Sequence, residues 1–202
     1  MRTTLLLLLG LLASAASAQQ SIYVGIGLGN FDYAESAVDP SFGQVSDAAV
    51  TRKLFGGFEI NDHFALEVNY AKTDNLRYEN TVAFADSQAP GGVVNVSGRI
   101  ETDFTTTSFS GIGQVPFDWG VLLGGLGFYS TDSDYSQRVS VDGSIVASGQ
   151  TTFNDDGLTA MLGIEWRFGR FGTRYGVRLE YEWWDISQVD ASAVGLAFSY
   201  GF

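Results

Sequence analysis

The sequence predicts an all-β chain that closes into an eight-stranded antiparallel up-and-down transmembrane β-barrel, and three observations carry this prediction. Beyond residue 20 the dominant hydrophobic period is two, which is the period of a strand with two different faces. Short and long connections alternate along most of the chain, as they do in an up-and-down barrel. The side chains opposite the apolar ones are mostly Gly, Ala, Ser and Thr, which suit a narrow interior.

The N-terminal segment predicts export. Residues 1–18 are expected to be a signal peptide and residues 19–202 the barrel domain. Arg2 provides a basic start, residues 5–12 are almost all leucine, and residues 16–18 form a small-residue cleavage site. A buried N-terminal helix would not account for this order. No later apolar run approaches the roughly 18 residues that a spanning helix needs, so a mature chain in a membrane must be a closed barrel.

Composition excludes several classes of function. The net charge is −12, and losing Arg2 with the leader makes the mature chain more acidic still. Nucleic acid is therefore not an expected partner, because phosphates are bound by Lys and Arg. The chain has no cysteine, which excludes disulfides, thiol catalysis, thiolate metal sites and a lipoprotein anchor.

The period-two pattern divides the mature chain into strands and connections. Residues 75–100 and 131–153 are expected to be long polar connections, although a part such as 92–96 could extend a hairpin above the barrel. Residues 32–47 form a further acidic connection. The eight predicted strands cover about 22–29, 49–60, 63–74, 101–115, 119–130, 156–168, 173–185 and 193–202.

The apolar side chains of each strand are expected to face lipid. In the fifth strand this assigns Val121, Leu123 and Tyr129 to the lipid-facing side, and in the sixth it assigns Leu162. Aromatic side chains gather near strand ends, where membrane barrels carry aromatic girdles. The expected girdles comprise Trp119, Trp166, Phe168, Tyr175 and Phe202 beside the short turns, and Tyr129, Trp183 and Trp184 at the opposite end.

Charged side chains on the opposite faces predict a structural network in the barrel lumen. Charges confined in a narrow interior must be paired or hydrated. Both signs occur on the sixth and seventh strands, so Glu165 is expected to pair with Arg178 or Arg174. The expected lumen charges are Glu59, Glu67, Glu165, Arg167, Arg174, Arg178 and Glu180.

Three segments carry a resemblance to a known family. They are the glycine-rich opening at 23–27, residues 56–67, and the closing segment 196–202. With these, the mature chain resembles the small outer-membrane β-barrel family, which includes the OmpA transmembrane domain, OmpX and the opacity-type surface proteins. The resemblance implies location in the bacterial outer membrane among its lipid and lipopolysaccharide. It also implies an assembly signal, read by the barrel-assembly machinery, formed by Phe198, Tyr200 and Phe202.

Two sets of residues could carry chemistry. His63 is the only histidine, and it falls at a predicted short turn. Lipid A hydrolases of similar architecture use residues that face the outer leaflet, and this turn is expected at the opposite end of the barrel. Carboxylates could bind Ca²⁺ or Mg²⁺, but their spacing does not match a calcium loop, so we interpret them as solvated charge. We therefore expect no catalytic, cofactor or metal site. The carboxylates are Asp132, Asp134, Asp142, Asp155 and Asp156.

The sequence favours an integral outer-membrane protein with a structural or surface-interaction role through long acidic extracellular loops. The alternative is a narrow, porin-like channel for ions or small solutes, although eight strands leave little room inside. A soluble, lipocalin-like carrier is more distant, and a lipid-modifying enzyme more distant still. We expect a monomer, and the sequence does not identify a loop ligand.

Overall fold

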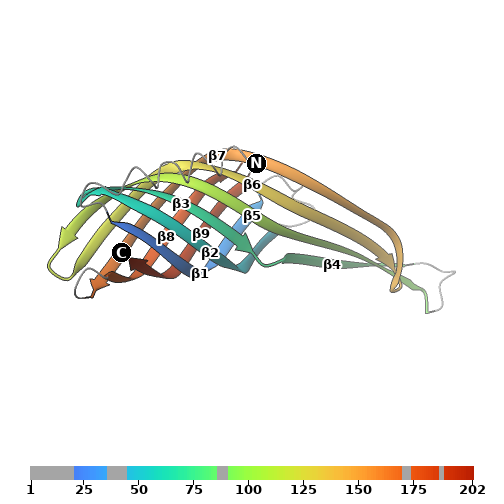
Figure 1. The fold of residues 1–202 in the computed structure, drawn as a ribbon. Coiled ribbons are helices and arrows are strands. Elements are labelled where there is room, and N and C mark those ends of the chain that lie inside the picture. The colour runs from blue at the N-terminus through green and yellow to red at the C-terminus, as the bar shows by residue number, and fades with distance from the viewer. Residues whose placement is uncertain (1–20, 36–44, 86–90, 170–173, 187–188) are drawn as a thin grey trace.

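The computed structural model describes residues 21–35, 45–85, 91–169, 174–186 and 189–202, which form nine strands (Figure 1). The signal peptide expected at 1–18 lies outside the described residues, as does most of the turn expected at 169–172. No helix in the described part of the chain is long and apolar enough to cross a membrane. The strands are β1 (Ile22–Glu35), β2 (Val45–Asn61), β3 (Phe64–Thr73), β4 (Leu76–Ala85), β5 (Val93–Phe117), β6 (Gly120–Val141), β7 (Ser144–Phe168), β8 (Arg174–Ile186) and β9 (Val189–Gly201).

Eight of these strands close into an antiparallel ring, which confirms the predicted fold class. The sheet order is β3-β2-β1-β9-β8-β7-β6-β5-β4, and a further pairing of β3 with β5 closes the ring and leaves β4 outside it. The first and last strands pair along their length, from Tyr23 opposite Gly201 to Glu35 opposite Val189. Closure removes both edges of the sheet, so every barrel strand has a hydrogen-bonding neighbour on each side.

The apolar side chains of most strands point away from the barrel interior. Leu162 on β7 is 66% exposed and its neighbour Met161 is buried. The same alternation holds on β1, where Ile26 and Leu28 point outwards. A water-soluble protein rarely leaves such a continuous apolar surface uncovered, whereas hydrocarbon is a suitable solvent for it.

The fifth predicted strand has the opposite orientation from the one expected. On β6, Val121, Leu123 and Tyr129 are buried in the interior, while Leu126 and Phe128 point outwards. This strand carries apolar side chains on both faces, so hydrophobic contrast alone could not determine which face is inside. Tyr129 therefore does not belong to an outer girdle.

The aromatic girdles are only partly as predicted. The aromatic side chains beside the short turns are exposed, namely Trp119, Trp166, Phe168, Tyr175 and Phe202. At the other end Trp183 is exposed, but Trp184 is buried inside the barrel. Adjacent residues on a strand point to opposite faces, so only one of this tryptophan pair could face outwards.

The segments 75–100 and 131–153, expected to be long polar connections, are largely β-sheet. β4 pairs with the outer end of β5, and β5, β6 and β7 continue together well past the barrel (Figure 1). We call this part the extension, comprising 76–85, 93–103, 132–141 and 144–156. At about 3.3 Å per residue, the outer end of β5 reaches about 35 Å beyond the barrel. These strands were missed because polar or small residues such as Asn80, Gly98 and Gln137 interrupt the apolar side chains on one face and weaken the period of two.

A two-residue turn joins β6 to β7 at the far tip of the extension. Asp142 has φ 46° and Gly143 has φ 81°. Positive φ at both positions is the requirement of a type I′ turn, which Asp-Gly meets readily. The Asp142 carboxylate also accepts a hydrogen bond of 2.9 Å from the amide of Asn95, which ties the tip to β5.

Because the apolar face points outwards into lipid, a charge introduced on that face should destabilise the protein more than a charge introduced in the extension. Replacing Leu162 with Arg places a cation in hydrocarbon, and we expect a loss of about 2–4 kcal/mol in the free energy of unfolding. The matched change Gln150→Arg, on the same strand but in the extension, should cost less than about 0.5 kcal/mol. Equilibrium urea unfolding in phospholipid vesicles measures both, and equal losses would contradict the assigned orientation.

Candidate functional site

The centre of the lumen is a buried ion pair between β8 and β3. The Arg178 guanidinium lies 2.8 Å from Glu67 Oε2, and their side chains are 2% and 0% exposed. The Tyr23 hydroxyl donates a second hydrogen bond of 2.8 Å to the same carboxylate oxygen. The guanidinium also lies 4.7 Å from the centre of the Phe55 ring. Arg178 is thus stabilised by an ion pair with Glu67 and by a cation–π contact with Phe55.

A second group of charges lies nearer the short turns. Arg167 binds two carboxylates, Glu165 at 2.8 Å and Glu59 at 3.2 Å. Arg174 also forms an ion pair with Glu59. β2, β7 and β8 each contribute to this group, so it links three strands across the interior.

Glu165 has different partners from those the sequence suggested. It lies opposite Arg178 in the register of β7 and β8, yet its carboxylate binds Arg167 and accepts a 2.6 Å hydrogen bond from Ser199. Arg174, the other suggested partner, binds a carboxylate on β2. The face of each residue could be predicted from alternation, but the partner depends on how far each side chain reaches across the lumen.

Two lumen charges were missing from the predicted network. Lys53 forms ion pairs with Glu180 and Glu182, and its side chain is 5% exposed. The sequence contained the signal, because Lys53 lies on the same face of its strand as Glu59, and Glu182 on the same face as Glu180. Together the structure places all the predicted lumen charges inside the barrel wall and adds these two.

An aromatic cap closes the lumen at the end that bears the extension. The Phe31 ring lies 5.4 Å from Phe104 and 5.7 Å from Trp184, measured between ring centres. The Tyr129 hydroxyl donates a hydrogen bond of 2.7 Å to the backbone carbonyl of Asp185. The buried cluster also contains Leu76, Ala49, Ala191 and Ala193. A second apolar cluster, nearer the short turns, comprises Tyr23, Phe55, Ala65, Ile112, Val121, Leu123, Met161 and Ala197.

His63 lies at the β2–β3 turn, where the sequence places it. Its backbone amide donates to Asn61 Oδ1 at 2.8 Å, and the amide of Phe64 donates to the same oxygen at 2.9 Å. The His63 ring nitrogen Nδ1 lies 3.3 Å from the carbonyl oxygen of Gln114. These contacts describe a histidine that stabilises a turn.

The carboxylates considered as metal ligands are spread along the extension and its base. Asp132 accepts a hydrogen bond of 2.6 Å from Asn154, and Asp134 accepts one of 2.8 Å from Thr152. Asp142 lies at the tip turn. Among the residues that the structure describes, no group of three or more His, Cys, Asp or Glu side chains could hold a metal ion.

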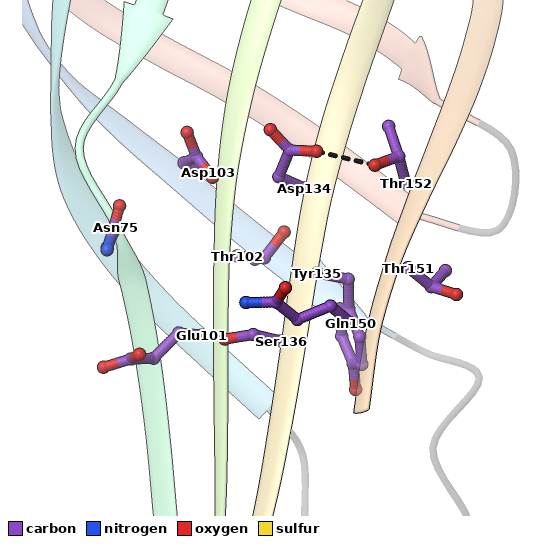
Figure 2. A pocket seen from close by; sticks show the side chains of 10 residues that line it. All are labelled: Asn75, Glu101, Thr102, Asp103, Asp134, Tyr135, Ser136, Gln150, Thr151 and Thr152. Atoms are coloured by element: carbon purple, nitrogen blue, oxygen red, sulfur yellow. Dashed lines mark hydrogen bonds between the residues drawn. The ribbon is translucent and has the colours of Figure 1, made fainter. Parts of the chain in front are cut away.

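A polar hollow of about 460 Å³ lies on the extension (Figure 2). Its carboxylates come from β5 and β6, and the hydrogen bond from Thr152 to Asp134 crosses from β7 to β6. Such a lining offers hydrogen-bond acceptors and negative charge, and little apolar surface. The lining residues are Asn75, Glu101, Thr102, Asp103, Asp134, Tyr135, Ser136, Gln150, Thr151 and Thr152.

Ion pairs follow β4 and β5 on the same side of the extension. Arg77 lies 2.5 Å from Glu79, and Arg99 binds Glu101. The hydrogen bond and the charge of Arg77 lower the pKa of Glu79. The Arg77–Glu79 pair is exposed and the Arg99–Glu101 pair is half-buried. Such pairs close to water contribute little stability individually, but they keep this side of the sheet hydrophilic.

Comparison with known proteins supports a single architecture. The chain matches the family described as "Outer membrane protein beta-barrel domain" over residues 3–202. It is similar to the crystal structure of Ail, the attachment invasion locus protein of Yersinia pestis, in complex with the heparin analogue sucrose octasulfate. The TM-score is 0.56 at 14% identity, covering 92% of this chain and 100% of that one. OprG of Pseudomonas aeruginosa gives a TM-score of 0.51 at 13% identity, covering 92% and 96%. No curated protein matches the chain. Identities this low show the fold alone.

The central ion pair predicts a large effect from removing one partner. Glu67→Leu leaves Arg178 buried without its nearest counter-charge, and we expect a loss of about 3–5 kcal/mol in the free energy of unfolding. The double variant Glu67→Leu, Arg178→Met should recover most of that loss. Asp74→Asn removes the exposed partner of Arg52 and should cost less than about 1 kcal/mol. Urea unfolding in lipid vesicles provides the values, and equal costs at the two pairs would refute the assignment.

Proposed function

Because the chain belongs to the outer membrane protein β-barrel domain family, we propose that it is a closed membrane anchor that presents its extension for interactions at the cell surface. The chain is located in the bacterial outer membrane. The observation that carries the proposal is the combination of a filled lumen with a sheet that continues about 35 Å past the barrel.

The filled lumen favours an anchor over a channel. Arg178, Glu67 and Lys53 occupy the middle of the barrel, and the cap of Phe31, Phe104 and Trp184 lies beyond them. An eight-stranded barrel has an interior just wide enough for side chains to fill. A continuous water path for ions or small solutes would require several of these groups to move together.

The outward apolar surface contradicts the soluble carrier that the sequence left open. A lipocalin-like protein keeps its apolar side chains inside and its polar ones in water. Here Leu126, on the outer wall, is 74% exposed, and the interior contains the charges. The proposal likewise includes no catalytic step, since His63 is engaged at a turn.

The extension is the surface that we propose for binding. Its charged side carries more carboxylates than basic groups, and the whole chain has a net charge of −12. Ail was solved with a sulfated, polyanionic ligand. The charge of the present chain disfavours such a ligand, so we propose neutral or basic partners.

Assembly and lipid contacts belong to the same proposal. Phe198 and Phe202 point outwards beside β1, and the backbone of Phe202 exchanges hydrogen bonds of 3.0 and 3.3 Å with Ile22. We propose that Phe198, Tyr200 and Phe202 act as the signal for the barrel-assembly machinery. Outer-membrane lipid and lipopolysaccharide would surround the apolar belt.

An anchor with an outward extension predicts the side of the membrane on which each turn lies. An epitope inserted between Asp142 and Gly143 should be labelled by antibody on intact cells. The same epitope inserted at the Asp118–Trp119 turn, at the opposite end of the barrel, should be labelled only after permeabilisation. Labelling of the second tag on intact cells, or failure to label the first, would overturn the orientation.

A filled lumen predicts that the protein does not conduct ions across a bilayer. The purified chain, refolded into a planar bilayer, should give no stable single-channel steps at either polarity. A porin refolded in the same way serves as the positive control. Long-lived, uniform steps from the chain would replace the anchor with a narrow pore.

A further inference from the structure

The two faces of the extension differ in charge. The strands of the extension keep the register of the barrel, so successive side chains alternate between two faces. We call the face that is continuous with the lumen side of the barrel wall the inner face, and the opposite face the outer face. The outer face carries Glu79, Arg99, Glu101, Asp103, Asp132 and Asp134, among others. Asp155 lies on the inner face where the extension joins the barrel. Between Asp155 and the tip of the extension, no described side chain of the inner face is charged. The sheet is therefore amphipathic outside the membrane.

The inner face is largely apolar, and no described residue of the chain covers it. In the strand register, Val82 of β4 lies opposite Val96 of β5, which lies opposite Val141 of β6. Phe84 lies opposite Val94, closer to the tip. Val82 is 47% exposed and Phe84 is 54% exposed.

The apolar surface continues across β7 to the barrel. Phe153 is 59% exposed, and its ring contacts Tyr135 with 6.5 Å between ring centres. Phe104, in the same row of the sheet, belongs to the buried aromatic cap. The exposed surface is thus continuous with the core of the barrel.

A sheet with one apolar face is normally half of a two-layer structure. Within the described residues the extension has only one layer, so a second layer must come from another source. We propose that the inner face packs against the same face of a second copy of this chain. The inference adds a partner at the uncharged inner face, separate from the neutral or basic partners proposed for the charged side, and it rests on the proposed function because it requires the extension to lie outside the membrane.

The size of the face suits self-association. Four strands about 4.8 Å apart, each about ten residues long at about 3.3 Å per residue, give roughly 600 Å². This approaches the roughly 800 Å² per partner of a stable interface, and the exposed edge of β7 can add to it. The inference departs from the expectation of a monomer.

Charge complementarity favours a second copy over other occupants. Two inner faces bring no like charges together, whereas contact through the outer faces would oppose carboxylates. A charged ligand would lose water at the inner face without gaining a counter-charge. The surrounding membrane meets the outer wall of the barrel, whose continuation in the extension is the charged face. Two such sheets pack about 10 Å apart.

Cross-linking tests the interface, because the chain has no cysteine of its own. Single cysteines at Val82, Gln137 or Phe153 probe the inner face. Cysteines at their neighbours Thr81, Ser136 and Thr152 are matched controls on the outer face. With a bis-maleimide of about 10 Å span and the chain in lipid vesicles, we expect dimers from the inner series and at least tenfold fewer from the outer series.

A charge placed on the inner face should separate the copies. Multi-angle light scattering in detergent should give twice the chain mass for the unaltered protein. Val82→Glu together with Phe153→Glu should halve that mass, while Thr81→Glu with Thr152→Glu should not. Heat-modifiable migration on gels verifies that each variant keeps its barrel.

Three outcomes would overturn the inference. The unaltered chain could be a monomer by scattering, the two cysteine series could cross-link equally, or inner cysteines could be shielded from maleimide without forming dimers. The last result would assign the face to a different occupant. Labelling of the epitope at Asp142–Gly143 on intact cells separates failure of this inference from failure of the proposed function.

Discussion

The closed ring of backbone hydrogen bonds is the constraint on which the rest of the structure depends. Hydrocarbon offers no partner to an amide or a carbonyl, so a sheet in a membrane must leave no free edge. The pairings of β1 with β9 and of β3 with β5 meet this requirement. Once the ring is closed, alternation forces one face of every strand towards lipid and the other into a narrow interior. The apolar belt and the packed lumen are both consequences of that closure.

The packed lumen shows how a small barrel accommodates charged side chains in a narrow interior. Arg178, Glu67 and Lys53 pair with groups on other strands, and apolar clusters lie at two levels beside them. The Arg178–Glu67 and Lys53–Glu180 ion pairs join strands that are far apart in the sequence, which opposes sliding of one strand against another. The same packing of the described side chains fills the interior, and it is the basis for proposing an anchor instead of a channel.

The extension is free of the membrane constraint and follows different rules. β4 lies outside the ring, and the outer part of β7 has a neighbour only on one side. Water can satisfy free edges there, so the sheet tolerates them. Water does not, however, favour an uncovered face with Val82, Phe84 and Phe153. That imbalance is the physical basis for proposing that another layer covers the face.

Prediction from sequence succeeded where one face was apolar and the other was small or charged. Segments such as 156–168 and 193–202 had a clear period of two, and their faces are as predicted. It failed on β6, where Leu123 was expected to face lipid but is buried, and Leu126 on the opposite face points outwards. It also missed the extension, because polar and small residues interrupt the apolar face of its strands.

The lumen charges show a second limit of the sequence. Alternation places Lys53 and Glu182 on the inner face, but their pairing depends on the ring geometry and on side-chain reach. No local pattern contains that information. The sequence can therefore predict which residues enter the lumen more readily than which of them meet.

The most direct test of the account is the depth of Leu162 in a bilayer. A fluorophore on Leu162→Cys, in vesicles containing lipids brominated along the acyl chain, should be strongly quenched. The same fluorophore on Gln150→Cys, farther along the same strand, should be unaffected. Absence of quenching at Leu162 would contradict a barrel whose apolar side chains face lipid.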